Sequence, residues 1–155
     1  MRKLINFNQF LSESFNVKKD SLKLSDSIRY NIYDNKQKIG DIILSETEYD
    51  HIGIKDDLGS DNIIYLSYVT IKEEHRGKKF FKRTLDWLVN TSLGKYDYIV
   101  LRVDTDSDVS FETLKKMYSK YGFKSFTPYN IDEYKYEFEY VEGEDNFMYY
   151  KLSTF

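Results

Sequence analysis

The chain has 155 residues and a formal net charge of −3, with two His and no Cys. This length suits one domain with a sizeable core, so we expect a single domain over 1–155. The lack of Cys excludes disulfides, thiolate metal sites and a thiol nucleophile, and with two His we expect no metal centre.

The charge balance disfavours a nucleic-acid partner, because such partners call for a strongly basic protein. No apolar run approaches the roughly 20 residues that span a membrane, and the start lacks the apolar stretch of a signal peptide. We therefore expect a cytoplasmic protein with no membrane or nucleic-acid partner.

The first segment, 1–15, is predicted to be a short amphipathic helix. Its apolar residues recur at helical spacing: Leu4, Phe7, Leu11 and Phe15. This helix either docks on the domain as a structural element or serves as a detachable targeting or packaging segment.

A β-hairpin is predicted next, because two β-rich runs, 28–34 and 38–46, flank a short polar turn. Before it, 16–27 is expected to hold a short strand or loop around Leu22 and Leu24. After it, 47–62 is expected to be a loop, with a short strand at 51–54.

The strongest pattern in the chain predicts a strand–helix–strand unit. An almost continuous apolar run, 62–71, precedes a charged turn and an amphipathic helix over 80–92. The next strand, 96–104, is apolar on both faces, which is typical of a central parallel strand. A crossover of this length predicts that the two strands are parallel and the connection right-handed.

A second helix is predicted after the acidic segment 104–110, with Asp108 or Ser110 as its N-cap and Gly122 as its C-terminal stop. Three further segments are expected to be strands: 123–126, 133–140 and 147–152. The chain is therefore expected to be an α/β protein in which helices flank a central mixed sheet.

The turn between the strand 62–71 and the helix 80–92 is a candidate anion site. A helix N-terminus offers free backbone N–H groups and a positive dipole end, which suits a polyphosphate. Its cationic residues are Lys72, Arg76, Lys78, Lys79, Lys82 and Arg83. The alternative is a solvated basic turn without a ligand.

Two motifs resemble the GCN5-related N-acetyltransferase family. His75–Phe81 (HRGKKFF) is similar to the family's Arg/Gln-x-x-Gly-x-Gly/Ala loop, and Tyr118–Phe123 is similar to its Tyr-x-x-x-Gly-Phe helix end. The resemblance covers about 28–152 and implies a mixed sheet whose parallel strands, 62–71 and 96–104, splay apart. With its short, phage-like start, the chain resembles a compact, phage-type member.

This resemblance implies an acetyltransferase that uses acetyl-CoA and acts on a primary amine: a protein lysine, a protein N-terminus or a small molecule. It implies that backbone groups of Val69, Thr70 and Ile71 pair with the pantetheine arm. The pyrophosphate would lie on Arg76, Gly77, Lys78, Lys79, Phe80 and Phe81. Tyr118 would protonate the departing thiolate, although plain packing is the alternative for this residue.

The chain departs from the family pattern at several positions. Lys79 and Phe81 replace small residues of the phosphate loop, and Phe81 is expected to narrow the site. Phe111 stands where the family often has Asn, and the usual pair of helices before the first hairpin is missing. The strand 62–71 offers no carboxylate, so Glu46 is the nearest candidate base. We expect His75, Glu73 and Glu74 to be exposed.

These departures keep other functions open. One is a catalytically silent domain of the same fold that binds a host or phage protein through the aromatic face of 133–140. Another is a virion component directed by 1–15. A homodimer is also left open, and the acceptor is not readable from the sequence.

Overall fold

The computed structural model describes residues 15–20, 26–103, 108–134, 137 and 147–152. The helix expected over 1–15 lies outside these residues except for Phe15, which begins a strand instead. Leu22 and Leu24, around which a strand or loop was expected, also lie outside them. None of the helices in the described ranges is long and apolar enough to cross a membrane.

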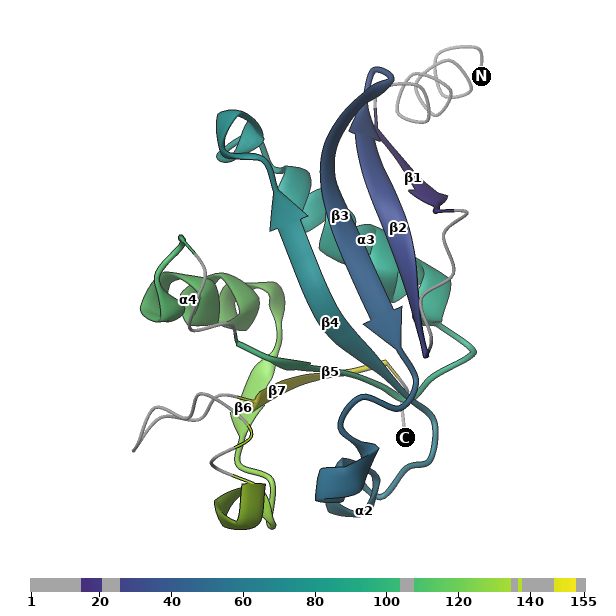
Figure 1. Ribbon diagram of the computed structural model, residues 1–155, viewed down its shortest axis with the longest axis vertical. Coiled ribbons are helices and arrows are strands. Elements are labelled where there is room, and N and C mark those ends of the chain that lie inside the picture. The colour runs from purple at the N-terminus through teal and green to yellow at the C-terminus, as the bar shows by residue number, and fades with distance from the viewer. Residues whose placement is uncertain (1–14, 21–25, 104–107, 135–136, 138–146, 153–155) are drawn as a thin grey trace.

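The core of the fold is a seven-stranded mixed sheet with the order β1-β2-β3-β4-β5-β7-β6 (Figure 1). Among the strands that the structure describes, only β4 and β5 pair in parallel, and every other neighbouring pair is antiparallel. The strands are β1 Phe15–Lys19, β2 Ser27–Asp34, β3 Gln37–Ser45, β4 Ile63–Ile71, β5 Tyr98–Arg102, β6 Lys124–Phe126 and β7 Phe147–Lys151. The predicted mixed sheet with a parallel pair is confirmed.

The predicted hairpin forms between β2 and β3. Its turn consists of Asn35 and Lys36, which both have positive φ, at 48° and 72°. Two successive left-handed residues are the geometry that matches the twist of a two-residue hairpin. Only seven residues separate β1 from β2, which is too few for a pair of helices between these two strands.

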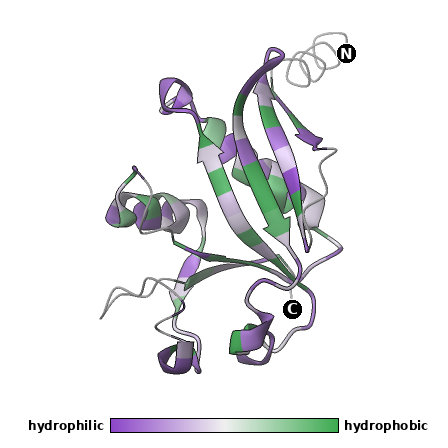
Figure 2. Cartoon of the chain, in the orientation of Figure 1, coloured by the Kyte–Doolittle hydropathy of each residue, from purple (hydrophilic) through white to green (hydrophobic). Residues whose placement is uncertain are grey.

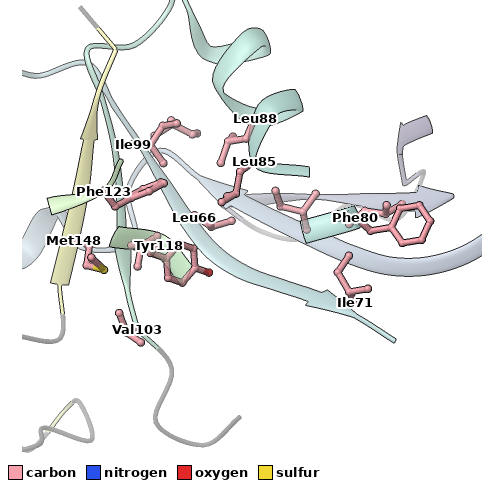
Figure 3. Close-up of a cluster of buried hydrophobic side chains, with 14 of the residues drawn as sticks. Leu66, Ile71, Phe80, Leu85, Leu88, Ile99, Val103, Tyr118, Phe123 and Met148 are labelled. Carbon is pink, nitrogen blue, oxygen red and sulfur yellow. The ribbon is translucent and has the colours of Figure 1, made fainter. Parts of the chain in front are cut away.

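Two helices cover one face of the sheet, α3 Phe80–Ser92 and α4 Phe111–Tyr121. Leu85 and Leu88 of α3 and Tyr118 of α4 belong to one buried cluster with side chains of β3, β4, β5 and β7 (Figure 3). Figure 2 shows the C-terminal half of β3 as hydrophobic and the loop before α3 as hydrophilic. Both helices were predicted from the spacing of their apolar residues.

The opposite face is covered by short helices, and here the prediction of a loop with a strand at 51–54 is wrong. Asp50–Ile52 forms a 3₁₀ helix and Ile54–Leu58 forms α2, separated by Gly53 at φ 82°. Ile52 and Ile54 are fully buried in a second cluster with Tyr65 and Phe147. The left-handed backbone at Gly53 interrupts an extended path between these two isoleucines, which excludes the short strand.

The strand predicted for 133–140 does not form at its described positions. Glu133 and Tyr134 belong to a 3₁₀ helix, Ile131–Tyr134, and Glu137 lies in a turn. The remaining residues of that segment lie outside the described ranges. The 3₁₀ turn begins at Pro128, whose carbonyl accepts the Ile131 N–H, and it buries Ile131 against the second cluster. The local turn therefore overrides the alternating pattern.

The α4 helix has a defined cap at each end. Ser110 is the N-cap, and its Oγ accepts the Thr113 N–H at 3.2 Å. Gly122 follows the last helical residue, and its N–H and that of Phe123 donate to the Tyr118 carbonyl. The choice between Asp108 and Ser110 is thus resolved in favour of Ser110.

Substituting Ser110→Ala is expected to lower the free energy of unfolding by about 1 kcal/mol, because the first turn of α4 loses its cap. Urea unfolding followed by circular dichroism measures this change. The matched control is Ser119→Ala, at an exposed position of the same helix, where Ala is the better helix former. Equal stability of wild type and Ser110→Ala would contradict the assignment.

Candidate active site

The site begins where β4 and β5 part. The two strands pair at four positions, from Ile63 with Tyr98 to Leu66 with Leu101. Beyond Leu66, β4 continues to Ile71, whereas β5 ends at Arg102. In the described ranges, the second half of β4 therefore has no β5 partner on that side, and the two arms diverge in Figure 1. Such an edge can accept an extended ligand as an added strand.

A β-bulge lies at the point of divergence. Ile43 pairs with Tyr68 and Leu44 with Leu66, so Ser67 is an extra residue in β4. The extra residue changes which side chains face the helices: Leu66 and then Val69 both contact the cluster beneath α3. A bulge also bends the strand and increases its twist, which favours the divergence of β4 from β5.

Two cavities lie at this divergence, and the larger of these two, of about 720 Å³, lies between β4, α3 and α4. Its size falls within the range of small-molecule sites. One wall is β4, with the predicted residues Val69, Thr70 and Ile71. The loop wall includes four more predicted residues: Arg76, Gly77, Lys79 and Phe81. Lys78 is exposed and Phe80 is buried in the core, and neither lines the cavity.

The loop at the start of α3 has the left-handed turns of an anion-binding loop. Gly77 has φ 80°, and Lys79, the residue before α3, has φ 67° and ψ 12°. Lys79 thus adopts a conformation that glycine normally supplies. The first N–H groups of the 13-residue α3 follow directly, so the loop and helix end offer both N–H donors and a favourable dipole to an anion.

Arg76 links two walls of the cavity. Its Nε donates to the Ile71 carbonyl at 2.9 Å, and its Nη1 forms an ion pair with Asp108 at 3.0 Å. These contacts fix the end of β4 to the segment before α4. Arg76 therefore has a structural role at this loop in addition to the charge that it contributes.

Phe81 lies in the cavity wall and does not close the site. Its ring packs edge-on against Tyr118, with the ring centroids 5.3 Å apart. The cavity keeps its 720 Å³ with Phe81 in place. The large residue therefore lies against a neighbouring ring of α4 while leaving the space in front of the loop.

Tyr118 is a buried residue, 6% exposed, that borders a second cavity of about 170 Å³. Its ring also contacts Phe123, and its hydroxyl oxygen is turned away from Met148 in Figure 3. Val69 and Leu114 line both cavities. The larger and smaller cavities therefore adjoin at these two side chains, next to Tyr118.

The smaller cavity is lined by a cluster of polar side chains that the sequence analysis did not predict. Glu48, Tyr49 and Arg102 line it together with Ser67 of the bulge. The Ser67 hydroxyl donates to the Glu48 carboxylate. Burial raises the pKa of Tyr49, and the Glu48 charge raises it further while Arg102 opposes this. Tyr49 is therefore a neutral phenol at physiological pH.

Glu46, the predicted base, does not line the smaller cavity. It is exposed, accepts a hydrogen bond from the Tyr96 hydroxyl at 2.5 Å and lines a different cavity from Tyr118. Burial, together with the hydrogen bond to Glu46, raises the pKa of Tyr96 to about 12. Of the two glutamates, the one that shares a cavity with Tyr118 is Glu48.

A short turn explains why Glu48 reaches this position. After β3, the Ser45 hydroxyl accepts the N–H groups of Thr47 and Glu48, each at 3.1 Å. A serine followed by such a turn is a signal that can be seen in the sequence. The direction in which Glu48 then points depends on the helices that follow, and these were not predicted.

The expectation that His75 is exposed is wrong, whereas Glu73 and Glu74 are exposed as expected. His75 is 8% exposed and lines the larger cavity, and its ring packs edge-on against Phe80 with the ring centroids 6.1 Å apart. The 3₁₀ turn Glu73–His75 places it under the loop, with its N–H bonded to the Lys72 carbonyl.

No protein-family model matches the chain, and no curated protein sequence matches it. Solved structures do. GCN5 from Tetrahymena is 13% identical over 85% of this chain and 72% of its own, with a TM-score of 0.55. Spermidine N-acetyltransferase from Vibrio cholerae is 20% identical over 83% of this chain and 67% of its own, with a TM-score of 0.55. IAA acetyltransferase from Bacillus cereus is 19% identical over 82% of this chain and 79% of its own, with a TM-score of 0.54.

These similarities identify the fold. The protein has the fold of the GCN5-related N-acetyltransferases: a mixed sheet whose parallel pair, β4 and β5, splays apart and is flanked by helices. The fold that the resemblance of the two motifs implied is therefore confirmed. At these identities the comparison establishes architecture, and chemistry has to be argued from the site.

Replacing Lys79 by Gly is expected to stabilise the protein by about 0.5–1 kcal/mol. Relief of a left-handed non-glycine residue is worth about 1–3 kcal/mol, which outweighs the greater unfolded-state entropy of Gly, about 0.4–1 kcal/mol. Chemical unfolding measures the difference.

The matched control is Gly77→Ala, which is expected to destabilise by about 1–2 kcal/mol. No atom lies within 4 Å of the place where its Cβ would stand, so the cost comes from the backbone alone. If Lys79→Gly were the less stable of the two variants, the loop conformation described above would be wrong.

Proposed function

We propose that this protein is an N-acetyltransferase that transfers the acetyl group of acetyl-CoA to a primary amine by direct attack. The acceptor is a protein lysine, a protein N-terminus or a small amine. The observation that carries the proposal is the pair of adjoining cavities at Val69 and Leu114, one beneath an anion-binding loop and the other beside a carboxylate and Tyr118.

Acetyl-CoA is the cosubstrate in this proposal, and the larger cavity suits its parts. Backbone groups of Val69, Thr70 and Ile71 at the open edge of β4 would hold the pantetheine arm. The N–H groups around Gly77 to Phe81 and the nearby cations would hold the pyrophosphate. The thioester supplies the acetyl group, and the residues of this chain bind it, orient it and move protons.

The smaller cavity supplies the proton transfers. Glu48 accepts the proton that the attacking amine loses, and Tyr118 donates a proton to the departing thiolate. A backbone N–H near Val69 stabilises the oxyanion. Because the chain has no Cys, no acetyl-cysteine intermediate forms and the amine attacks the thioester directly.

Acetyl-CoA is expected to raise the melting temperature, because a ligand that binds only the folded state stabilises it by about 2.7 kcal/mol at 100 times its Kd. Thermal unfolding with millimolar acetyl-CoA measures this. Pantetheine without phosphates is the matched ligand and is expected to shift the melting temperature far less. Absence of a shift with acetyl-CoA would contradict the proposal.

Tyr118→Phe is expected to lower kcat by about 10²–10⁴-fold, since it removes the proton donor and keeps the ring packing. Steady-state release of CoA measures the rate, and the melting temperature should stay unchanged. Tyr98→Phe is the matched control, because Tyr98 lies on the face covered by α2. Full activity of Tyr118→Phe would assign Tyr118 to packing alone.

Glu48→Gln is expected to lower kcat by about 10²-fold or more through loss of the base. Glu46→Gln is the comparison variant. A loss confined to Glu46→Gln would return the role of base to Glu46, and a loss in neither variant would leave the amine to be deprotonated by solvent.

The second candidate is a catalytically silent module of the same fold that binds a host or phage protein. Lys79 and Phe81, at positions where the family has small residues, favour it. In that case acetyl-CoA would not shift the melting temperature, and Tyr118→Phe would leave every cellular phenotype intact.

A further inference from the structure

We infer that the acceptor is a small amine that carries a carboxylate close to its amino group, as a free amino acid does. This inference rests on the proposed function and narrows its acceptor class. It is carried by the residues that line the smaller cavity, which combine both signs of charge: Glu48 at an exposed position and Arg102 at a half-buried one.

The two charged side chains come from opposite sides of the splay. Glu48 belongs to the turn after β3, and Arg102 is the last residue of β5. Glu48 raises and Arg102 lowers the pKa of Tyr49, so both side chains lie close to the Tyr49 hydroxyl. Among the described residues that line this cavity, these are the only two with a formal charge.

The size of the cavity limits what can enter it. At about 170 Å³ it lies below the roughly 300–1,000 Å³ of drug-sized sites. It suits a compact head group that brings its charges together, and it leaves little room for a long chain with several ammonium groups.

Charge decides between the amine classes. Arg102 attracts a carboxylate and can bind it through two parallel hydrogen bonds. The same guanidinium repels a second ammonium group, so it works against a polyamine. Glu48 attracts the ammonium end and takes the proton that has to leave before attack. The proton that the nitrogen loses after attack replaces the one that Tyr118 gives to the thiolate. An acceptor with one positive and one negative group therefore complements this cavity, whereas a polyamine complements only half of it.

In this proposal the amino and carboxylate groups of the acceptor have a fixed order. Val69 and Leu114 form the wall shared with the larger cavity, and Arg102 stands on the β5 arm. An amino group held by Glu48 beside Tyr118 lies near the acetyl donor, while a neighbouring carboxylate is held by Arg102. Recognition of the carboxylate thus fixes the amine for attack.

The test compares matched acceptors that differ only in the carboxylate. Acetyl transfer from acetyl-CoA is measured with alanine against ethylamine, with leucine against 3-methylbutylamine, and with spermidine as the polyamine. We expect kcat/KM for each amino acid to exceed that of its matched amine at least tenfold, and spermidine to be the poorest acceptor.

Variants of Arg102 connect this preference to the residue. Arg102→Gln is expected to bring the ratio for each matched pair close to one, mainly by raising KM for the amino acid. Arg102→Lys keeps the charge without the paired hydrogen bonds and should retain part of the preference. The melting temperature of each variant shows whether it folds. If the variants fail to fold, the ratio of kcat/KM values measured with the wild type still tests the inference.

The outcomes separate the two proposals. Transfer to plain amines at least as fast as to amino acids, or a ratio that Arg102→Gln leaves unchanged, would overturn this inference and leave the acetyltransferase proposal intact. Binding of acetyl-CoA with no transfer to any acceptor in the panel or to protein amines would overturn both.

Discussion

The structure depends on one feature of backbone pairing: β4 and β5 stop pairing at Leu66 and Leu101. β5 itself ends one residue later, at Arg102, whereas β4 continues to Ile71. Here the bulge at Ser67 changes the course of β4, and the side chains of α4 fill the space between the arms. The open edge, both cavities and the position of Tyr118 all follow from this early end of the ladder.

Aromatic packing joins the two halves of the site. Phe81 of α3 contacts Tyr118 of α4, and Tyr118 contacts Phe123 after that helix. Edge-on pairs of this kind are worth about 0.5–1.5 kcal/mol each beyond simple burial. The large side chain of Phe81 in the first turn of α3 therefore supports the ring that is proposed to act in the reaction.

The sequence was informative wherever one local signal dominated. Apolar spacing located α3 and α4, and Gly122 marked the end of α4. It was misleading where burial came from distant residues. The path of Ile52 and Ile54 and the inward position of His75 depend on the sheet and on Phe80. Glu48 was missed for the same reason, because its direction is set by tertiary packing that no local pattern encodes.

The segment between β3 and β4 has a consequence for how this protein can change. It carries Glu48 and Tyr49 at the smaller cavity, and a few residues later it covers the second core with Ile52 and Ile54. The proposed acceptor recognition and the closure of the second core therefore depend on the same stretch of chain. In many enzymes specificity loops evolve freely on a rigid scaffold. Here a substitution that changes the acceptor must also preserve the packing of Ile52 and Ile54 in the second core. Fewer substitutions are therefore available to evolution or to an engineer.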